Sequence, residues 1–298
     1  MKEKIIFNVI YLPENRGLGN ALNLAIHNAS YELIARMDSD DISLPNRFEE
    51  QIKLFMENNN LDVVGGYISE FIGTEDNIIG YREVKTNDVS IKKNMKKRCP
   101  MNHVSVIFKR SAVLNSGGYI DFPYNEDYYL WIRMMQHNYI FENLPNVVVN
   151  VRAGFDMANR RGGNTYYKSE KQIQKYMFKN HIISFPRYII NTFIRFIVEI
   201  VMTKRLRSTF FRIIRKKNNF SQSKHKKNNI INNEEFPKFS VAMSVYVKDN
   251  PEWFDKALKS ISIDQSIKPA EIVLVVDGPV SDEILLVIEK YKNLLSNL

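Results

Sequence analysis

Short apolar runs alternate with segments of helical periodicity along the first half of the chain. Strands alternating with helices are typical of an α/β fold with a mostly parallel central sheet, in which ligands bind at the carboxyl ends of the strands. Five strands are expected, at 5–11, 31–37, 61–71, 101–108 and 141–151, with one helix beginning at Ala21 and another at 47–58.

The pattern changes after residue 165. Residues 166–217 have helical periodicity, and 188–202 is strongly apolar, but Arg195 and Glu199 interrupt it. A helix that crosses a bilayer needs about 18 uncharged residues, so we expect this segment to lie on a membrane surface or to pack on the domain. Residues 216–238 are rich in Asn, Lys and Ser, which predicts a flexible linker.

The alternating pattern starts again after this linker. A strand at 239–246, a helix at 251–262, a strand at 272–276 and a helix at 282–295 make a complete β-α-β-α unit. Such a short unit cannot bury an adequate core alone. We therefore expect it to dock on the rest of the chain or on another molecule.

The composition is that of a folded protein with one large domain or two modest ones, since 44% of the 298 residues are hydrophobic. The one cysteine, Cys99, excludes an intrachain disulfide and favours a reducing compartment. The apolar run near the N-terminus is broken by Asn8 and has no small-residue cleavage site, so we expect a strand there and not a signal peptide. The expected location is the cytoplasm.

The net charge of +9 is concentrated in one segment, because ten Lys and Arg and no acid lie between Lys204 and Lys227. Such a segment can face nucleic acid, anionic lipid or only solvent, and charge alone does not choose. No recognisable nucleic-acid-binding module accompanies it, so we expect no nucleic-acid partner.

Three carboxylates follow the strand at 31–37. Alternation places Asp38 and Asp40 on the same side of an extended backbone, where both can bind one hard cation through oxygen. The alternative is a polar loop in which Asp41 or Ser43 caps the next helix.

A glycine-containing turn at 15–20 allows the backbone to approach a ligand, and Arg16 could meet an anionic group there. A tight strand-to-helix turn explains the glycines equally well. Arg161 lies in a basic loop that suits phosphate contacts or is simply solvated.

Glu126 and Asp127 head an aromatic-rich helix. The helix macrodipole stabilises acids at this position, so capping alone could explain both residues.

Ordered motifs throughout the chain are similar to those of one enzyme family. The C-terminal unit contains FSVAMSVY at 239–246 and EIVLVVDGP at 271–279, and the N-terminal half contains NRGLGNALN at 15–23 and IARMDSDDIS at 34–43. NHVSV at 102–106, GGY at 117–119 and the pair Glu126 and Asp127 follow. Together these motifs resemble glycosyltransferase family 2, and most closely its branch that builds bacterial exopolysaccharides and O-antigens.

The order of the motifs differs from that of the family, whose first β-α-β-α unit stands here at the C-terminus. Joining Leu298 to Met1 would restore the usual order, so we predict a circular permutant. A flexible linker of about 22 residues has an r.m.s. reach of about 26 Å, enough to cross a domain of this size. The alternative is that 239–298 begins a second transferase and docks on another molecule in a swapped dimer.

The resemblance implies a GT-A, Rossmann-like α/β fold that binds a nucleotide-diphospho-sugar. It assigns 1–95 to the second part of the nucleotide-sugar-binding domain, 96–165 to the acceptor-binding part, 166–215 to a helical basic segment at a membrane surface, 216–238 to the linker and 239–298 to the first β-α-β-α unit.

The resemblance also implies a metal-dependent, inverting mechanism. Asp40 and Asp38 would hold Mg²⁺ or Mn²⁺ against the donor diphosphate, and Asp127 would be the general base for the acceptor hydroxyl. Tyr246 and Asp277 would border the nucleobase and ribose of the donor, for which a UDP-sugar is favoured. The family often has a second acid before Asp277 and an Asn after Tyr246, and both positions are valine here.

Further residues are implied around the substrates. Arg16, Gly19 and Asp38 would contact the donor, and Glu126, His103 and Arg161 would lie on the acceptor or phosphate side; a structural role for His103 stays open. The acceptor would be a saccharide or a lipid-linked sugar, reached at the inner face of the cell membrane. A catalytically inactive or incomplete transferase-like protein that binds nucleotide or membrane and needs a second chain remains the alternative.

Overall fold

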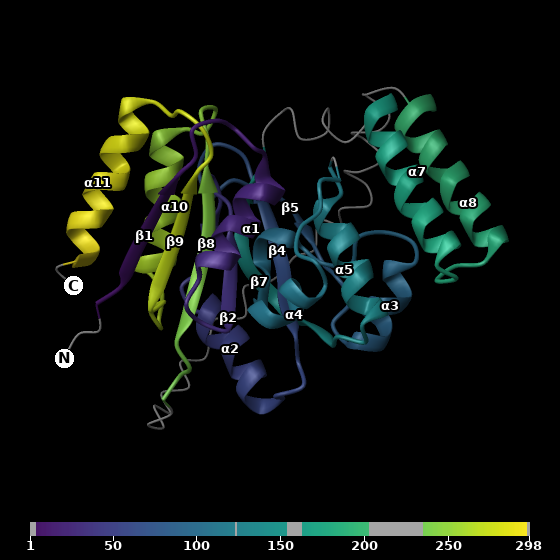
Figure 1. Ribbon diagram of the computed structural model, residues 1–298, viewed down its shortest axis with the longest axis horizontal. Helices are drawn as coiled ribbons and strands as arrows, with labels where there is room; N and C mark the ends of the chain where they lie inside the picture. Colours follow the sequence, from purple (N-terminus) through teal and green to yellow (C-terminus); the bar gives the residue numbers. More distant parts are fainter. Residues whose placement is uncertain (1–3, 123, 154–162, 203–234, 297–298) are drawn as a thin grey trace.

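The computed structural model describes residues 4–122, 124–153, 163–202 and 235–296. These residues form one mixed, mostly parallel sheet with helices on both faces, and a pair of helices, α7 and α8, projects at one end (Figure 1). The predicted α/β class is confirmed.

The strands and helices follow the expected alternation. The strands are β1 (Ile6–Tyr11), β2 (Leu33–Met37), β3 (Ile42–Ser43), β4 (Val63–Phe71), β5 (Ile78–Arg82), β6 (Ile107–Lys109), β7 (Phe141–Arg152), β8 (Phe239–Val245) and β9 (Glu271–Val276). The helices are α1 (Leu18–Asn28), α2 (Arg47–Glu57), α3 (Asp88–Met95), α4 (Arg110–Asn115), α5 (Glu126–Gln136), α7 (Asn164–Lys179), α8 (Phe185–Phe196), α10 (Pro251–Ser262) and α11 (Asp282–Ser296), with a 3₁₀ turn η1 (His103–Ser105) and a π-helical turn η2 (Ile197–Val201).

The C-terminal strands lie inside the sheet and not at its edge. The strand order is β1-β9-β8-β2-β6-β4-β7-β3, with β5 paired to β4. β9 pairs in parallel with both β1 and β8, and β8 pairs in parallel with β2. In Figure 1 the green and yellow strands accordingly stand between the purple strands β1 and β2. The C-terminal β-α-β-α unit therefore docks on the rest of the same chain.

This insertion is the arrangement that a circular permutation predicts. The first and last described elements, β1 and α11, also pack side by side on one side of the molecule (Figure 1). The permutation itself stays a prediction, and so do the five assigned segments.

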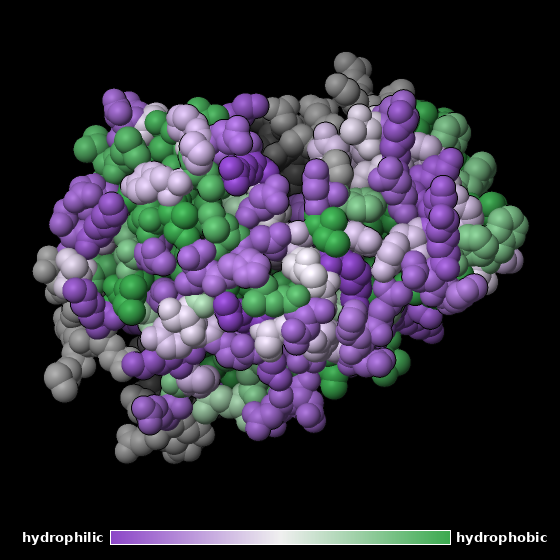
Figure 2. Space-filling model, in the orientation of Figure 1, coloured by the Kyte–Doolittle hydropathy of each residue, from purple (hydrophilic) through white to green (hydrophobic). Residues whose placement is uncertain are grey.

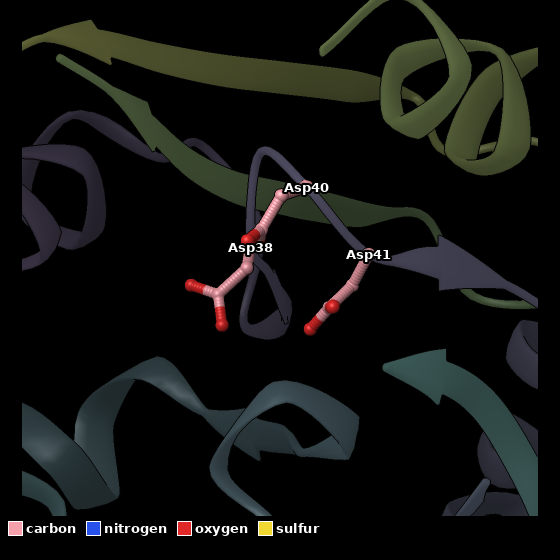
Figure 3. A group of neighbouring side chains, drawn as sticks. All are labelled: Asp38, Asp40 and Asp41. Carbon is pink, nitrogen blue, oxygen red and sulfur yellow. The ribbon is translucent and has the colours of Figure 1, made fainter. Parts of the chain in front are cut away.

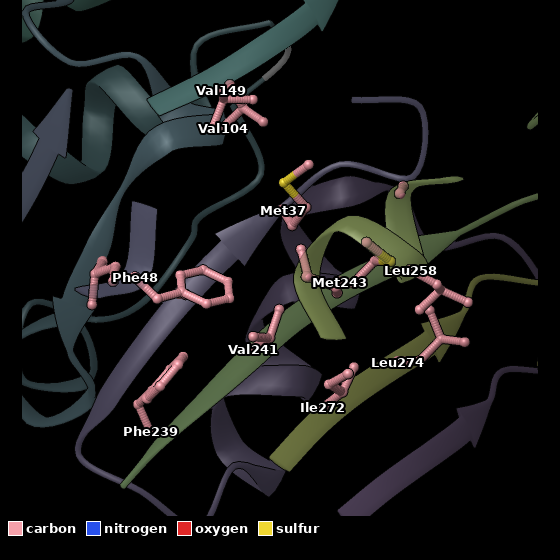
Figure 4. Packing of buried hydrophobic residues seen from close by; sticks show 14 of the residues in the cluster. Met37, Phe48, Val104, Val149, Phe239, Val241, Met243, Leu258, Ile272 and Leu274 are labelled. Carbon is pink, nitrogen blue, oxygen red and sulfur yellow. The ribbon is translucent and has the colours of Figure 1, made fainter. Parts of the chain in front are cut away.

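The core has two apolar layers, one on each face of the sheet. Alternate residues of β9 enter different layers, since Ile272 and Leu274 pack on the side of α10 and α11 while Val273 and Val275 pack on the side of α1. Figure 4 shows the first layer. Burial on both faces explains why β9 is apolar from Ile272 to Val276, as expected of an inner parallel strand.

One predicted strand is wrong. Residues 101–108 were expected to be extended throughout, but the structure has the turn η1 followed by the short strand β6. Side-chain hydrogen bonds explain the turn, because Asn102 Nδ2 and Ser105 Oγ both donate to the Gly66 carbonyl oxygen, at 2.8 and 3.2 Å. Asn and Ser side chains that bond to the backbone in this way compete with a β-ladder. The structure also contains β5 and α3, which the polar pattern of residues 75–98 did not indicate.

As far as residue 202, the helical pattern predicted for 166–217 corresponds to α7, α8 and η2. Residues 203–217, and the expected linker apart from 235–238, lie outside the described residues. Among the described residues, the structure contains no helix that is both long enough and apolar enough to cross a membrane.

Candidate active site

Three aspartates gather where β2 ends. Asp38, Asp40 and Asp41 each offer a carboxylate oxygen, and these oxygens all lie within 4.8 Å of one another (Figure 3). The chain turns at residues 39–40 before β3, which brings Asp41 back toward Asp38. The predicted acidic strand end is thus a compact group of oxygen ligands.

Asp38 is held by the buried Arg36 on β2. Arg36 Nη1 donates to Asp38 Oδ2 at 2.7 Å, and Arg36 Nη2 forms an ion pair with the other carboxylate oxygen. This two-point contact fixes the orientation of the Asp38 carboxylate.

Asp40 is half-buried and Asp41 is buried, and both repel their neighbours. Burial and then the charge of Asp38 raise the pKa of Asp40 to about 6. Burial and then the charge of Asp40 raise the pKa of Asp41, whose Oδ1 accepts a hydrogen bond from the Arg152 backbone N–H at 2.8 Å. A divalent cation would relieve this repulsion, and oxygen donors are the ligands that Mg²⁺ and Mn²⁺ prefer. The three carboxylates therefore fit such an ion.

The C-terminal unit contributes a fourth acid to this region. Asp249 Oδ2 accepts hydrogen bonds from Ser39 Oγ at 2.7 Å and from the Tyr246 backbone N–H at 3.0 Å. The sequence analysis did not identify Asp249. Because β8 and β2 are parallel neighbours, the loop after β8 lies at the same edge of the sheet as Asp38.

The sequence analysis did not identify Arg152 as a site residue either. Its guanidinium lies over the rings of Phe71 and Trp253, at 4.6 and 4.4 Å from their centroids, and Nε donates to the Asp40 carbonyl oxygen at 3.2 Å. Arg152 therefore fastens the aspartate turn to both parts of the chain. The sequence signal was weak, because Arg152 follows an ordinary strand pattern.

Asp277, at the end of β9, fastens the glycine turn. Its two carboxylate oxygens accept hydrogen bonds from the backbone N–H groups of Arg16, at 2.7 Å, and Gly17, at 3.0 Å. Gly17 has a φ of 83°, a conformation that favours glycine. Asp277 is 4% exposed, whereas Tyr246 at the end of β8 is 37% exposed and the Arg16 side chain is half-exposed beside Glu14.

Glu126 and Asp127 begin α5, as predicted, and they have different surroundings. Burial and then the charge of Asp127 raise the pKa of Glu126 to about 7. Asp127 Oδ2 accepts a hydrogen bond from Cys99 Sγ at 3.4 Å. Gly19 on α1 lies near this point, since a Cβ on it would be 4.0 Å from that of Glu126, an ordinary van der Waals contact.

His103 lies deep beside Tyr119. Its Nε2 is 2.7 Å from the Tyr119 hydroxyl, and its ring also packs against that of Trp131. Burial lowers the pKa of His103 well below its ordinary value, so the imidazole is neutral. These contacts give His103 a structural role at least. Arg161 lies outside the described residues.

The aspartate group and the start of α5 are close enough to interact electrostatically. After burial and Asp127, the charges of Arg36 and Asp38 also act on Glu126. The structure thus brings together residues predicted from distant parts of the sequence, at the carboxyl edge of the sheet where nucleotides bind in α/β folds.

This fold and site define a GT-A-like α/β enzyme, and comparison with known proteins gives its family. Residues 1–115 match the model for glycosyl transferase family 2. An uncharacterised glycosyltransferase of Haemophilus influenzae is 36% identical over 72% of this chain and 79% of its own length. The amylovoran biosynthesis glycosyltransferase AmsE of Erwinia amylovora is 38% identical, over 56% of this chain and 62% of its own length. The UDP-Gal:α-D-GlcNAc-diphosphoundecaprenol β-1,3-galactosyltransferase of Escherichia coli is 32% identical, over 69% of this chain and 74% of its own length.

The chain belongs to glycosyltransferase family 2, as its motifs predicted. It is a glycosyltransferase whose relatives include a glycosyltransferase of amylovoran biosynthesis and one of O-antigen biosynthesis. The inactive alternative is not favoured.

Proposed function

We propose that this protein transfers a sugar, with inversion at the anomeric carbon, from a nucleotide-diphospho-sugar to a saccharide or lipid-linked acceptor in a metal-dependent reaction. The observation that supports this most directly is the group of three carboxylates within 4.8 Å at the carboxyl end of β2, in a chain of this family. A UDP-sugar is the favoured donor, and the printed activity of the Escherichia coli relative supports both this choice and a lipid-linked acceptor.

Asp38 and Asp40 are the residues that would hold Mg²⁺ or Mn²⁺, which when bound neutralises charge on the departing diphosphate. Asp41 supports them from a buried position, where its carboxylate already accepts the Arg152 backbone N–H. Arg36 orients Asp38 through their ion pair, and the hydrogen bond from Ser39 to Asp249 fastens the turn between the two proposed ligands.

Asp127 is the proposed general base. As the acceptor oxygen attacks the anomeric carbon, its proton passes to the Asp127 carboxylate, and the bond from that carbon to the diphosphate oxygen breaks. The nucleoside diphosphate leaves in the same displacement, so no covalent intermediate forms. Cys99 holds one oxygen of Asp127 and leaves the other for the acceptor.

Donor binding is assigned to the loops that follow β8, β9 and β1. Tyr246 is accessible at the end of β8, and Asp277 holds the turn that contains Arg16 and precedes Gly19. In this proposal the side chain of Arg16 meets a phosphate, and Glu126, His103 and Arg161 lie on the acceptor side. The protein works at the inner face of the cell membrane, where it reaches a lipid-linked acceptor.

The proposal is tested by release of nucleoside diphosphate from a panel of UDP- and GDP-sugars, with and without Mg²⁺ or Mn²⁺. We expect turnover of one or a few UDP-sugars that stops when the metal is chelated and when Asp40 is replaced in Asp40→Asn. Asp282→Asn, which makes the same change at the exposed start of α11, is the matched control. Turnover that survives both chelation and Asp40→Asn would contradict the proposal.

A further inference from the structure

Along one side of helix α8 and the turn η2, the polar side chains of Asn191, Arg195 and Glu199 lie toward the protein. Asn191 is 7% exposed, and its Nδ2 donates to the Lys96 carbonyl oxygen at 2.9 Å and to Gln174 Oε1 at 2.8 Å. Glu199, about two helical turns further along the same side, is buried as well. A helix on the surface of a water-soluble domain has the reverse arrangement, with its apolar stripe facing the core.

Buried ion pairs keep the helix in this orientation. Arg195 Nε lies 3.5 Å from Glu170 Oε2 on α7, and Arg195 Nη1 lies 3.5 Å from Glu199 Oε1. Turning α8 over to bury its apolar side would expose or separate these charges, which is costly for buried pairs. The ion pairs of Arg195 therefore keep the apolar side of α8 facing away from the domain.

The outer side of α8 and η2 is a continuous run of large hydrophobic side chains. These residues, which we call the apolar face, are each between 39% and 61% exposed. They are Phe185, Ile189, Ile190, Phe193, Ile194, Phe196, Ile200 and Val201. Figure 2 shows hydrophobic side chains at the right-hand end of the molecule, over α8. An exposed apolar patch of this kind marks an interaction surface.

Exposed lysines lie on α7, the helix that packs beside α8. Lys168, Lys171, Lys175 and Lys179 recur at helical spacing on the exposed side of α7, and hydrophilic side chains accordingly form a band beside the apolar ones in Figure 2. The acids of residues 163–202 are Glu170 and Glu199, and both are buried. The sequence that follows adds ten Lys and Arg without an acid between 204 and 227.

We propose that the apolar face is the surface by which this protein binds an anionic lipid bilayer, with α8 and η2 lying in the headgroup region. An apolar helical face beside a row of lysines is the combination that interfacial helices use, and Lys or Arg near an anionic surface strengthens the binding. A second copy of the chain fits less well, because its lysines would face these lysines.

The apolar face is also linked to the start of α5. Asn125 Nδ2 donates to Ser169 Oγ on α7 at 3.0 Å, and the charge of Asp127 acts on the neighbouring Glu170. The helical pair α7 and α8 thus connects the bilayer to the proposed general base. This last step rests on the proposed function, since it holds that membrane binding brings a lipid-linked acceptor to Asp127.

The test is flotation of the full-length protein with vesicles of phosphatidylcholine alone or mixed with phosphatidylglycerol. We expect binding to the anionic vesicles that weakens at high salt. The double variant Ile189→Ser, Phe193→Ser should lose about tenfold or more in vesicle affinity, because two large apolar groups no longer enter the bilayer. The matched control is Val89→Ser, Leu286→Ser, which changes two exposed apolar residues on α3 and α11 and should bind as the wild type does. Circular dichroism establishes that both variants are folded.

Equal binding by the double variant, or no binding by the wild type to anionic vesicles, would overturn the inference. A wild-type dimer that the double variant converts to monomer, without vesicle binding, would assign the apolar face to a second copy. Metal-dependent release of nucleoside diphosphate by the wild type in the absence of vesicles is measured separately. Failure of the proposed transferase and failure of the membrane surface are therefore distinguishable.

Discussion

The aspartate turn at residues 38–41 is held in place by residues outside the group of three carboxylates. Ser39, between the two proposed metal ligands, is tied by its hydroxyl to Asp249 of the C-terminal unit at 2.7 Å. The position of the turn therefore depends on a contact between residues 210 positions apart.

Ser39→Ala tests this contact without changing any charge. A hydrogen bond to a charged group contributes about 1.5–3 kcal/mol, and less when part of it faces solvent, so we expect Mn²⁺ affinity to fall by about fivefold or more. Manganese titration followed by electron paramagnetic resonance measures the change directly, with Ser90→Ala on α3 as the control. Unchanged affinity in Ser39→Ala would show that Asp249 does not position the turn.

Glu126 gives a second residue-level prediction. Its pKa in the folded protein is about 7, above the ordinary value of 4.5, because burial and Asp127 disfavour its charge. The folded state then binds the proton more tightly, so stability is greatest below the ordinary pKa and is lost as the pH rises through about 7.

Glu126→Gln removes this loss. At about pH 8 the variant should be more stable than the wild type by an amount of the order of 2 kcal/mol, and the difference should become small at about pH 5. Urea unfolding at both pH values measures it, and Glu289→Gln on the exposed side of α11 is the control. Acids that do not interact with Glu126 titrate alike in both proteins and cancel in the comparison. A stability difference that does not change with pH would refute the assigned pKa.

At the scale of elements, the end of β9 and the turn before α1 are joined through one buried carboxylate. Asp277 accepts the backbone N–H groups of both Arg16 and Gly17, in a position that is 4% exposed. This contact connects the last unit of the chain to its first helix.

Asp277→Ala should destabilise the protein by about 2–3 kcal/mol, because two partly buried N–H groups lose a charged acceptor that is itself buried. The change in the free energy of unfolding in urea tests this. Asp282→Ala, at the exposed start of α11, should cost less than about 1 kcal/mol. If both substitutions lower the free energy of unfolding by the same small amount, Asp277 does not link the two elements structurally. Nucleotide binding would then be its one proposed role.

Sequence patterns predicted most elements because their periodicity and turn residues agree with the tertiary structure. The run Ile272–Val276 is apolar throughout because both faces of β9 are covered, so composition alone marks an inner strand. The segment 101–108 failed because Asn102 and Ser105 bond to the Gly66 carbonyl oxygen, a partner distant in sequence that a local pattern does not contain.

The candidate site divides in the same way. Asp38, Asp40 and Asp127 were found because carboxylates at a strand end or helix start, within family motifs, have a recognisable pattern. Asp249 and Arg152 were missed because their importance depends on which strands are neighbours in the sheet. The inward polar side of α8 also required the structure, since the sequence shows an apolar segment but not which side faces the domain.

At the scale of the whole molecule, the sheet needs both ends of the chain. β8 and β9 fill the space between β1 and β2, so the C-terminal unit is an inner part of the fold. Inner parallel strands have both of their edges paired, and their loss would expose long apolar strands.

We therefore expect the protein to survive cleavage of its linker. With a protease site inserted between residues 216 and 238, the two fragments should remain together in size-exclusion chromatography after complete cleavage. They should separate only in denaturant. Fragments that separate in native buffer would show that the C-terminal unit docks weakly, and would favour exchange between molecules.

The central claim is that one chain of this family completes a metal-dependent transferase site from Asp38, Asp40 and Asp127. The most direct measurement is Mn²⁺- or Mg²⁺-dependent release of nucleoside diphosphate by monomer isolated by size exclusion, for the wild type, Asp127→Asn and the control Asp282→Asn. We predict turnover by the wild-type monomer and the control, and a fall of about 10²- to 10⁴-fold in Asp127→Asn, the usual contribution of a general base. An inactive monomer beside an active dimer, or full turnover in Asp127→Asn, would contradict the account.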